Sequence, residues 1–403
     1  MITGWHRLIP LSLASLFLTA CGGSTSPGVA SSGPNVTTAS VPPCGIEGTG
    51  VHIQDCNNGG DVTGLSMTTA RANHTATLLQ DGKVLIAGGF SAAGPALASA
   101  ELYDPSTGTF TATGDMIAAR GAHTADLLAN GKVLIAGGHT DATLWVSVTS
   151  AELYDPSTGA FTAAGSMIPN CCGGGTISSL LPDGRVFIAT EGNAEIYDPA
   201  AGTFALTGAY NTPVYAVYAT ILLADGRILF AASLDSASNN ETDELFDPKT
   251  NTFSPTGPRI EATIPSTATL LTNGTVLFVE GGLVYNNVEI YDPASGTFTV
   301  IGTTHYDHTG GTATRLDDGR VLIAGGQLPP PAVQSPPSTP SSNPGVELYV
   351  PATGTFVSAA SLSTGRYGHT ATLLTDGSVL IAGGYPSWRQ PTASAEIYKK
   401  LTN

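Results

Sequence analysis

Three copies of an Arg-x-x-His pattern are the residues of this sequence best suited to bind a ligand. They are Arg71 with His74, Arg120 with His123, and Arg366 with His369. An arginine presents its N–H donors in a rigid fork that matches a carboxylate, so three arginines in one place would bind an anion or a sugar acid. The alternative is a repeated structural pair, in which each Arg and His bonds the neighbouring backbone.

Metal and nucleophile chemistry has weaker support. The three histidines of the pattern, with His305 and His308, would bind copper or zinc only if the fold brought them together. Their spacing is that of a repeat and not of a metal site. The sequence contains no Gly-x-Ser-x-Gly, phosphate-loop or His-Glu-x-x-His motif. We expect no metal site and no cofactor, with copper or another metal left open.

The Arg-x-x-His pattern belongs to a repeat that returns seven times. Its first half reads His74-Thr-Ala-Thr-Leu-Leu-Gln-Asp81-Gly82-Lys-Val-Leu-Ile-Ala-Gly88-Gly89. Its second half reads Ala100-Glu101-Leu-Tyr103-Asp104-Pro105-Ser-Thr-Gly108-Thr-Phe110. The glutamate of the second half recurs at Glu101, Glu152, Glu195, Glu244, Glu289, Glu347 and Glu396. Successive Asp-Gly or Asn-Gly steps lie 42 to 58 residues apart, which suits four short strands per repeat.

Each half of the repeat predicts a hairpin. In the first half, Asp-Gly tolerates positive φ between two apolar runs. In the second half, Pro stands early in a turn and Gly at its left-handed position. We name the four expected strands a, b, c and d. Strands a and b are the more apolar pair, so we expect them deep in the fold and strands c and d outside.

The repeat resembles the kelch family over about residues 60–400. The resemblance rests on the Gly-Gly that ends strand b, on the Glu-Leu-Tyr-Asp-Pro that follows, and on the aromatic residue of strand d. The family's Trp on strand d is replaced by Phe110, Phe161, Phe204, Phe253, Phe298 and Phe356. Repeats 3 and 4 lack the Gly pair, with Ala189-Thr190 and Ala231-Ala232 in its place. The resemblance implies an all-β fold, a seven-bladed β-propeller of kelch repeats over residues 60–403.

Closure of the ring follows from counting strands. The chain ends at Asn403, just after the seventh Glu-Ile-Tyr, so the last repeat has no strand d of its own. An unpaired sheet edge is a liability that natural folds cover. We predict that the N-terminal segment Asp61–Leu65 supplies this strand, and Val51–Ile53 is the alternative.

The two kinds of connection fall on two faces of such a ring. The a–b and c–d turns are tight and share one face, whereas the b–c and d–a connections vary and share the other, where binding is expected. Trp145 and Trp388 lie in b–c loops and could stack on sugar rings or cover loop cores. Blade 6 carries a Pro-rich insertion, 327–344, that we expect to be polyproline-like or disordered. Blades 1, 2 and 7 are neighbours, so their Arg and His would gather at one side of the channel mouth.

Copper radical oxidases of the galactose oxidase type have kelch-like propellers too, and the segment Leu180–Phe187 is similar to their strand pair. That family places a Tyr-His pair of copper ligands at the start of such a strand. The dipeptides here are Asn73-His74, Ala122-His123, Gly175-Thr176, Val217-Tyr218, Pro265-Ser266, Gly310-Gly311 and Gly368-His369. None is Tyr-His, which argues against a radical copper site of that pattern.

The N-terminus predicts export. His6 and Arg7 precede an apolar run that is too short to span a bilayer, which is typical of a signal peptide at residues 1–20. Leu18-Thr19-Ala20-Cys21 resembles the bacterial lipobox, which implies lipidation of Cys21 and an anchor in the outer membrane or at the cell surface. An ordinary signal peptide is the alternative. Residues 21–59, rich in Gly, Ser, Thr and Pro, would form a flexible tether.

Four further cysteines favour disulfides in an exported protein. They are Cys44, Cys56, Cys171 and Cys172, and they allow three pairings. We favour a small loop closed by Cys44 and Cys56 and a bridge between the adjacent Cys171 and Cys172, with two reduced thiols as the alternative for the adjacent pair.

The charge of the chain restricts its partners. The net charge is −16, from 15 Lys and Arg against 31 Asp and Glu, which excludes non-specific nucleic-acid binding. We expect a monomeric binding or scaffolding propeller of the cell envelope whose ligand is a glycan or a protein. The alternative is a carbohydrate-active enzyme of the same face, whether an oxidase, an epimerase or a lyase. Fold alone does not separate the two.

Overall fold

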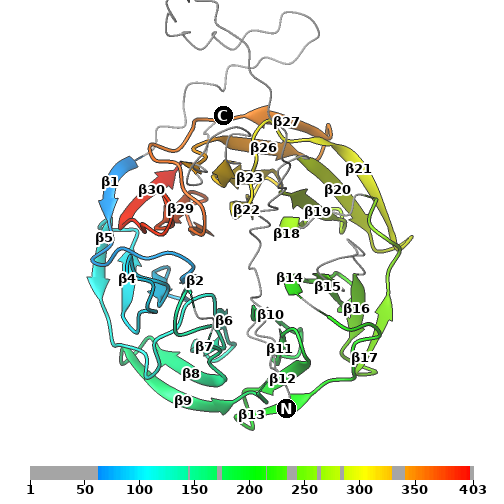
Figure 1. Cartoon of the computed structure of the whole chain (residues 1–403), viewed down its shortest axis with the longest axis horizontal. Coiled ribbons are helices and arrows are strands. Elements are labelled where there is room, and N and C mark those ends of the chain that lie inside the picture. Colours follow the sequence, from blue (N-terminus) through cyan, green and yellow to red (C-terminus); the bar gives the residue numbers. More distant parts are fainter. Residues whose placement is uncertain are drawn as a thin grey trace, which may run out of the picture. The chain divides into compact units, whose positions relative to one another are not determined.

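The computed structural model describes residues 62–143, 146–169, 175–214, 216–233, 243–260, 265–281, 286–328 and 341–399. All regular elements in these ranges are strands. They form seven four-stranded antiparallel sheets that stand radially around a central axis (Figure 1). The predicted seven-bladed β-propeller is confirmed. None of the described residues lies in a helix long and apolar enough to cross a membrane.

Each blade has its strands in the order a to d from the channel outward. Blade 1 consists of β2 (Thr75–Leu78), β3 (Val84–Ala87), β4 (Ala100–Asp104) and β5 (Thr109–Ala112). Blade 2 consists of β6 (Thr124–Leu127), β7 (Val133–Ala136), β8 (Ser150–Asp155) and β9 (Ala160–Ser166). Blade 3 consists of β10 (Ile177–Leu180), β11 (Val186–Ala189), β12 (Ala194–Asp198) and β13 (Thr203–Leu206). Blade 4 consists of β14 (Ala216–Leu222), β15 (Ile228–Ser233), β16 (Glu244–Asp247) and β17 (Thr252–Pro255).

The remaining blades follow the same plan. Blade 5 consists of β18 (Pro265–Leu270), β19 (Val276–Glu280), β20 (Asn287–Asp292) and β21 (Thr297–Thr303). Blade 6 consists of β22 (Thr312–Arg315), β23 (Val321–Ala324), β26 (Val346–Val350) and β27 (Thr355–Ser358). Blade 7 consists of β28 (Thr370–Leu373), β29 (Val379–Ala382), β30 (Ser394–Tyr398) and β1 (Val62–Ser66).

The N-terminal strand closes the ring. Strand β1 pairs antiparallel with β30, with Val62 opposite Ile397 and Ser66 opposite Ser394. The expected closing segment Asp61–Leu65 is therefore confirmed, with bounds one residue later along the chain. The first and last parts of the described chain lie in one sheet (Figure 1), so blade 7 has no unpaired outer edge at β30.

The apolar core lies between blades. Strand b of blade 1, Val-Leu-Ile-Ala, is fully buried, and its side chains alternate between the two sides of the sheet. Val84 and Ile86 pack against blade 7, whereas Leu85 and Ala87 pack against blade 2. Each of the seven core clusters joins two neighbouring blades in this way. The two apolar sides of strand b thus explain why the hairpins stand side by side around an axis.

An aromatic pair links strands c and d in six blades. In blade 1 the rings of Tyr103 and Phe110 lie opposite each other on paired strands, with centroids 4.8 Å apart. The phenylalanines that replace the family's strand-d tryptophan therefore pack against strand c. Blade 7 takes strand d from β1, where Leu65 packs against the core that blades 7 and 1 share.

The Pro-rich insertion of blade 6 is regular at both ends. Strands β24 (Gln327–Leu328) and β25 (Ser341–Ser342) pair as a two-stranded ladder. Residues 329–340, between them, lie outside the described residues. An isolated bridge from Ser341 to Ser387 connects this ladder to the b–c loop of blade 7. The two loops therefore support each other.

Candidate functional site

The strand-c glutamate of each blade binds the loop that enters that blade. All seven of these carboxylates are buried and accept backbone N–H bonds from the incoming d–a loop, at 2.6 to 3.2 Å. In blade 2, for example, Glu152 accepts from Ile117 and Ala118. The repeated glutamate thus holds the chain where it passes from one blade to the next.

The three arginines of the Arg-x-x-His pattern lie inside the blades. Arg71 is 0% exposed. Its Nη2 donates to Glu101 Oε1 at 2.7 Å, and its Nη1 donates to the carbonyl oxygen of Gly88 at 2.7 Å. Arg120 and Arg366 make the same contacts with Glu152 and Glu396 and are equally buried. Burial lowers the pKa of each arginine, and the partner glutamate opposes this shift.

This placement differs from the anion site proposed from sequence. We expected the guanidinium groups to gather at the channel mouth, but each lies within its own blade and none lines the central cavity. The physical reason is that a strand-c glutamate in the same sheet offers each arginine a closer, desolvated partner. The arginine contacts agree with the alternative stated above, in which Arg-x-x-His is a repeated structural pair that bonds the neighbouring backbone.

The Gly pair at the end of strand b contacts the next blade. Gly89 N donates to the carbonyl oxygen of Arg120 at 2.9 Å, and the equivalent bonds join blade 7 to blade 1 and blade 6 to blade 7. A Cβ on Gly88 would lie 2.3 Å from the Arg120 carbonyl oxygen, closer than any side chain can approach. Gly88 also has φ of +63°, a left-handed conformation that favours glycine. The Gly pair is therefore required where two blades meet closely.

The three histidines of the pattern bond a threonine of the preceding blade. His123 Nε2 and Thr75 Oγ1 are hydrogen-bonded at 3.0 Å. His74 bonds Thr370 and His369 bonds Thr312 at the same distance. Burial is the main cause that lowers the pKa of His123 and His369 from 6.5 to about 3, and nearby arginines add to this shift. These buried imidazoles are neutral, and each one links two neighbouring blades.

A backbone chain follows the same blades around the channel. Ala122 N donates to Asn73 O, Asn73 N donates to Gly368 O, and Gly368 N donates to Gly310 O, each at 2.8 Å. Asn73 and Ala122 have φ of +50° and +52°, which costs free energy for residues with a side chain. The same three contacts, made by the Gly pair, the His–Thr pair and the backbone, therefore connect blade 6 to blade 7, blade 7 to blade 1, and blade 1 to blade 2.

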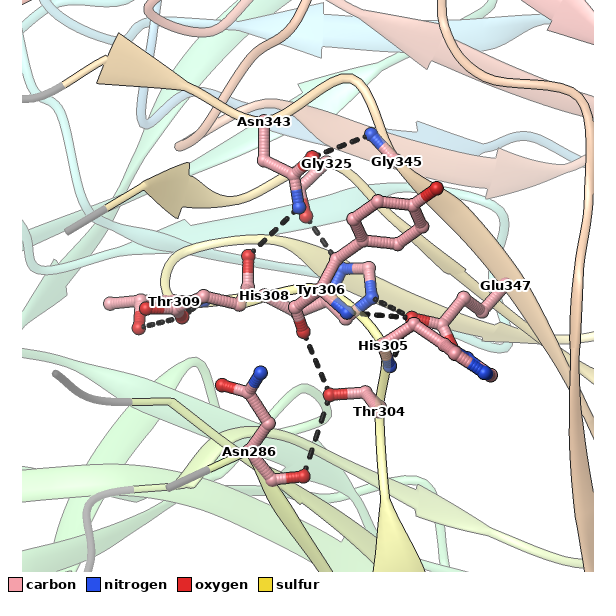
Figure 2. A network of polar contacts seen from close by, with 11 residues as sticks. Asn286, Thr304, His305, Tyr306, His308, Thr309, Gly325, Asn343, Gly345 and Glu347 are labelled. Carbon is pink, nitrogen blue, oxygen red and sulfur yellow. Dashed lines mark hydrogen bonds and ion pairs between the residues drawn. The ribbon is translucent and has the colours of Figure 1, made fainter. Parts of the chain in front are cut away.

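Blade 6 replaces the buried arginine with a histidine. Figure 2 shows His308 between two acceptors, with Nδ1 2.6 Å from the Gly325 carbonyl oxygen and Nε2 3.3 Å from Glu347 Oε1. His305, whose side chain is 60% exposed, places Nδ1 2.9 Å from Glu347 Oε2. Burial raises the pKa of Glu347, but hydrogen bonds from His308, His305 and Tyr306 bring it below its usual value.

An aromatic and cationic cluster lies on the variable face at blade 7. Trp388 and Arg389 belong to its b–c loop, and the Arg389 guanidinium lies 5.4 Å from the indole centroid. The rings of Tyr367 and Tyr385 lie next to each other, with centroids 5.3 Å apart. Burial raises the pKa of Tyr367, and a hydrogen bond with the Arg389 backbone opposes that shift. We call Tyr367, Tyr385, Trp388 and Arg389 the blade 7 cluster.

The central channel forms a cavity of about 480 Å³. Its wall consists of the first strands of the blades, and its lining includes His123 and Tyr218 among small residues such as Thr, Ser and Ala. The other two histidines of the pattern and all three arginines are not part of the lining. Sequence reasoning missed this cavity because small residues on strand a also suit plain packing.

Several residues singled out from sequence lie outside the described residues. These are Trp145, Cys21, Cys44, Cys56, Cys171 and Cys172. Trp388 is the one tryptophan that the described ranges contain, and it is partly exposed on the variable face. The disulfide and lipidation predictions therefore stay predictions.

The residues do not fit a copper site of the radical oxidase type. No group of three or more His, Cys, Asp or Glu side chains that could hold a metal ion occurs in the part of the chain that the structure describes. The three strand-a histidines bond threonines of different blades and do not converge. We derive no copper chemistry for this chain.

A pH-dependent stability is expected from His123. The unfolded chain binds a proton on this histidine below pH 6.5, whereas the folded protein takes it up only near pH 3. The free energy of unfolding should therefore fall as the pH drops through this window. In His123→Gln, the slope of the free energy of unfolding against pH should decrease by up to about 1.4 kcal/mol per pH unit. Urea unfolding between pH 6 and 4 measures this slope. Identical slopes for variant and wild type would contradict the buried neutral imidazole.

Comparison with known proteins agrees with this architecture. A model of the kelch motif matches residues 70–117 and 121–168. A search of curated protein sequences gives no match. A solved structure, a novel fungal alcohol oxidase with catalytic diversity among the AA5 family in complex with copper, is 17% identical, with a TM-score of 0.61. The match covers 84% of this chain and 76% of that chain and shows the fold alone. The chain is thus a seven-bladed β-propeller with kelch motifs in its first two blades.

Proposed function

We propose that the protein is a binding propeller of the cell envelope that recognises a glycan on its variable face, at the blade 7 cluster. The observation that carries the proposal is the partly exposed Trp388 with the Arg389 guanidinium over its ring. An indole face packs on the C–H face of a sugar ring, and a guanidinium donates hydrogen bonds to sugar oxygens.

The cluster is held in place before a ligand arrives. Gln390 N donates to Ser387 O at 3.1 Å, which closes the turn that carries Trp388. The bridge from Ser341 to Ser387 adds support from blade 6. Arg389 has φ of +53°, a strained conformation that the surrounding contacts must stabilise. A rigid aromatic group loses little conformational entropy on binding, which favours affinity.

A protein ligand is the second candidate, and a different set of residues favours it. Ile117, Ile168 and Ile260 occupy the same position in three d–a loops of the variable face, where each donates its backbone N–H to the strand-c glutamate. Their side chains are exposed, and Ile117 is 66% exposed. Exposed aliphatic side chains on one face suit a protein surface better than a sugar.

An enzyme of the same face is the alternative to a binding protein. The copper alcohol oxidase shares the fold, but at 17% identity this likeness carries no activity to the present chain. No described group of metal-ligating side chains supports an oxidase. We therefore place the enzyme second to the binding protein.

The envelope location rests on the N-terminal sequence. Lipidation of Cys21 would fix the chain to the outer membrane or to the cell surface, with residues 22–61 between the anchor and the first described strand. Such a tether lets a binding face reach ligands near the membrane. The ligand would be met at the envelope.

The glycan proposal predicts a loss of binding in Trp388→Ala. Removal of an anchoring indole should weaken the binding of an array-selected glycan at least ten-fold, because such anchors contribute about 2 kcal/mol or more. The measurement is a glycan array followed by calorimetric titration. Trp388→Phe is the matched control and should retain most of the affinity. A folded Trp388→Ala protein with wild-type affinity, or an array without any bound glycan, would contradict the proposal.

The anchor proposal predicts acylation of Cys21. Expression in a bacterium supplied with radiolabelled palmitate should label the wild-type protein and place it in the membrane fraction. Cys21→Ser should carry no label and appear in the soluble exported fraction. An unlabelled wild-type chain would show that the N-terminus is an ordinary signal peptide.

A further inference from the structure

The inner strand of each blade directs backbone N–H and C=O groups toward the channel. At the a–b turn of blade 1, Leu79 N donates to Lys83 O, and every other blade has the equivalent bond. Antiparallel strands alternate between hydrogen-bonded and non-hydrogen-bonded pairs. Going back along strand a from Leu79, every second residue forms a hydrogen-bonded pair with strand b, so Thr77 and Thr75 do. Ala76 lies between them and forms a non-hydrogen-bonded pair with Ile86. The backbone N–H and C=O of Ala76 therefore point away from strand b, toward the channel.

The same position recurs once in each blade and carries a small side chain. In each blade it is the strand-a residue that lies opposite the third residue of strand b. The seven residues are Ala76, Ala125, Ser178, Thr220, Ala268, Ala313 and Ala371. We call them the edge ring. All of them except Ala76 line the cavity. Small side chains leave the backbone donors and acceptors of the edge ring accessible.

Hydroxyl groups already bond edge-ring carbonyls where a neighbouring blade supplies one. Thr220 Oγ1 donates to Ser178 O at 2.7 Å, and Ser179 Oγ donates to Thr220 O at 3.2 Å. Thr269 Oγ1 donates to Ala313 O at 3.5 Å. These bonds show the geometry in which a hydroxyl satisfies an edge-ring carbonyl. A bound molecule with several hydroxyls would make the same contacts at the other blades.

Threonine hydroxyls add further polar groups to the cavity. Thr75, Thr124, Thr176, Thr267, Thr312 and Thr314 are among its lining residues. The Thr267 hydroxyl oxygen is buried and has no hydrogen-bond partner in the described part of the chain. A buried hydroxyl without a partner is costly, so a ligand or water at this point would be stabilised.

The described part of the cavity wall offers no charge to pair with an ion. Among the residues that the structure describes, the lining holds no Lys, Arg, Asp or Glu, and His123 is neutral near pH 7. Asp126 extends from the same strand as Thr124 but is not part of the lining, and its Oδ2 accepts from Ser178 Oγ at 2.6 Å. An ionic ligand would lose its hydration without a counter-charge in return. An apolar ligand would remove water from the backbone groups without replacing those hydrogen bonds.

We propose that the central channel is a second binding site, which takes a small, neutral, hydroxyl-rich molecule such as a monosaccharide or a cyclitol. The volume of about 480 Å³ lies within the range of about 300 to 1,000 Å³ typical of small-molecule sites. The ligand's hydroxyls donate to edge-ring carbonyls and accept from edge-ring N–H groups and threonine hydroxyls. This site is independent of the blade 7 cluster.

The test compares matched small molecules on the wild-type protein. Saturation-transfer NMR and calorimetry would use D-glucose, D-galactose, D-mannose and myo-inositol as neutral polyols. Glucosamine supplies a cation, gluconate an anion and cyclohexanol an apolar ring of similar size. At least one neutral polyol should bind saturably, and the other three probes should bind at least ten-fold more weakly. Absence of binding by all four neutral polyols, or equal binding by cyclohexanol, would overturn the proposal.

Substitutions of the wall locate the site. Thr267→Val and Thr314→Val keep the shape and remove one hydroxyl each, so each should weaken polyol binding about five-fold. Thr297→Val, on the exposed outer strand β21, is the matched control and should leave binding unchanged. Thermal unfolding establishes that each variant is folded. With two wall variants, the test can still be made if one of them does not fold.

Trp388→Ala separates the channel site from the proposed glycan site. The variant should bind the polyol as the wild type does. If polyol binding is lost in Trp388→Ala and retained in both threonine variants, the molecule binds the blade 7 cluster and the channel proposal is overturned. If the channel binds polyol but the array shows no Trp388-dependent glycan, the channel proposal stands without the proposed function.

Discussion

One buried carboxylate per blade accepts the backbone N–H groups of the loop that enters that blade, and the ring depends on this contact. The loop comes from the outer strand of the preceding blade, so a glutamate such as Glu152 fixes the passage from blade to blade. Without it, backbone donors in the loop would lose their partners in a desolvated place. The apolar clusters bring blades together, and the glutamate fixes the path of the chain between them.

The ring is reinforced unevenly around this common contact. Blades 6, 7, 1 and 2 add bonds from the Gly pair, the His–Thr pairs and the backbone chain near the channel. Blades 3 and 4 lack the Gly pair, with Ala189-Thr190 and Ala231-Ala232 at that position. The blade 7 cluster belongs to the reinforced part, which suits a preformed site. Strands from the reinforced blades and from the other blades line the channel. Its wall therefore contains threonines that bond a histidine, such as Thr75, and others that do not, such as Thr267.

The sequence was sufficient for the fold because the signals were local and repeated. Asp-Gly turns, Val-Leu-Ile-Ala runs and the missing seventh strand d led to the seven blades and to closure by the segment near Leu65. The site was harder, because Arg71 as a free anion ligand and Arg71 as the partner of Glu101 look alike in sequence. The two residues are 30 positions apart, too far for the periodicity of a single strand or helix to link them. The edge ring was also hidden, since alanine on strand a gives no indication of accessible backbone.

The most direct test of the central contact is the free energy of unfolding of Glu152→Gln, measured in urea at neutral pH. The amide has one acceptor oxygen in place of two, so a loop N–H loses its partner, and Arg120 is left buried without its counter-charge. The free energy should therefore fall by about 3–5 kcal/mol. Arg120→Met in the Glu152→Gln background should restore part of this loss, and Asp155→Asn, in the exposed turn of the same blade, should have a much smaller effect. A Glu152→Gln protein within about 1 kcal/mol of the wild type would contradict the account.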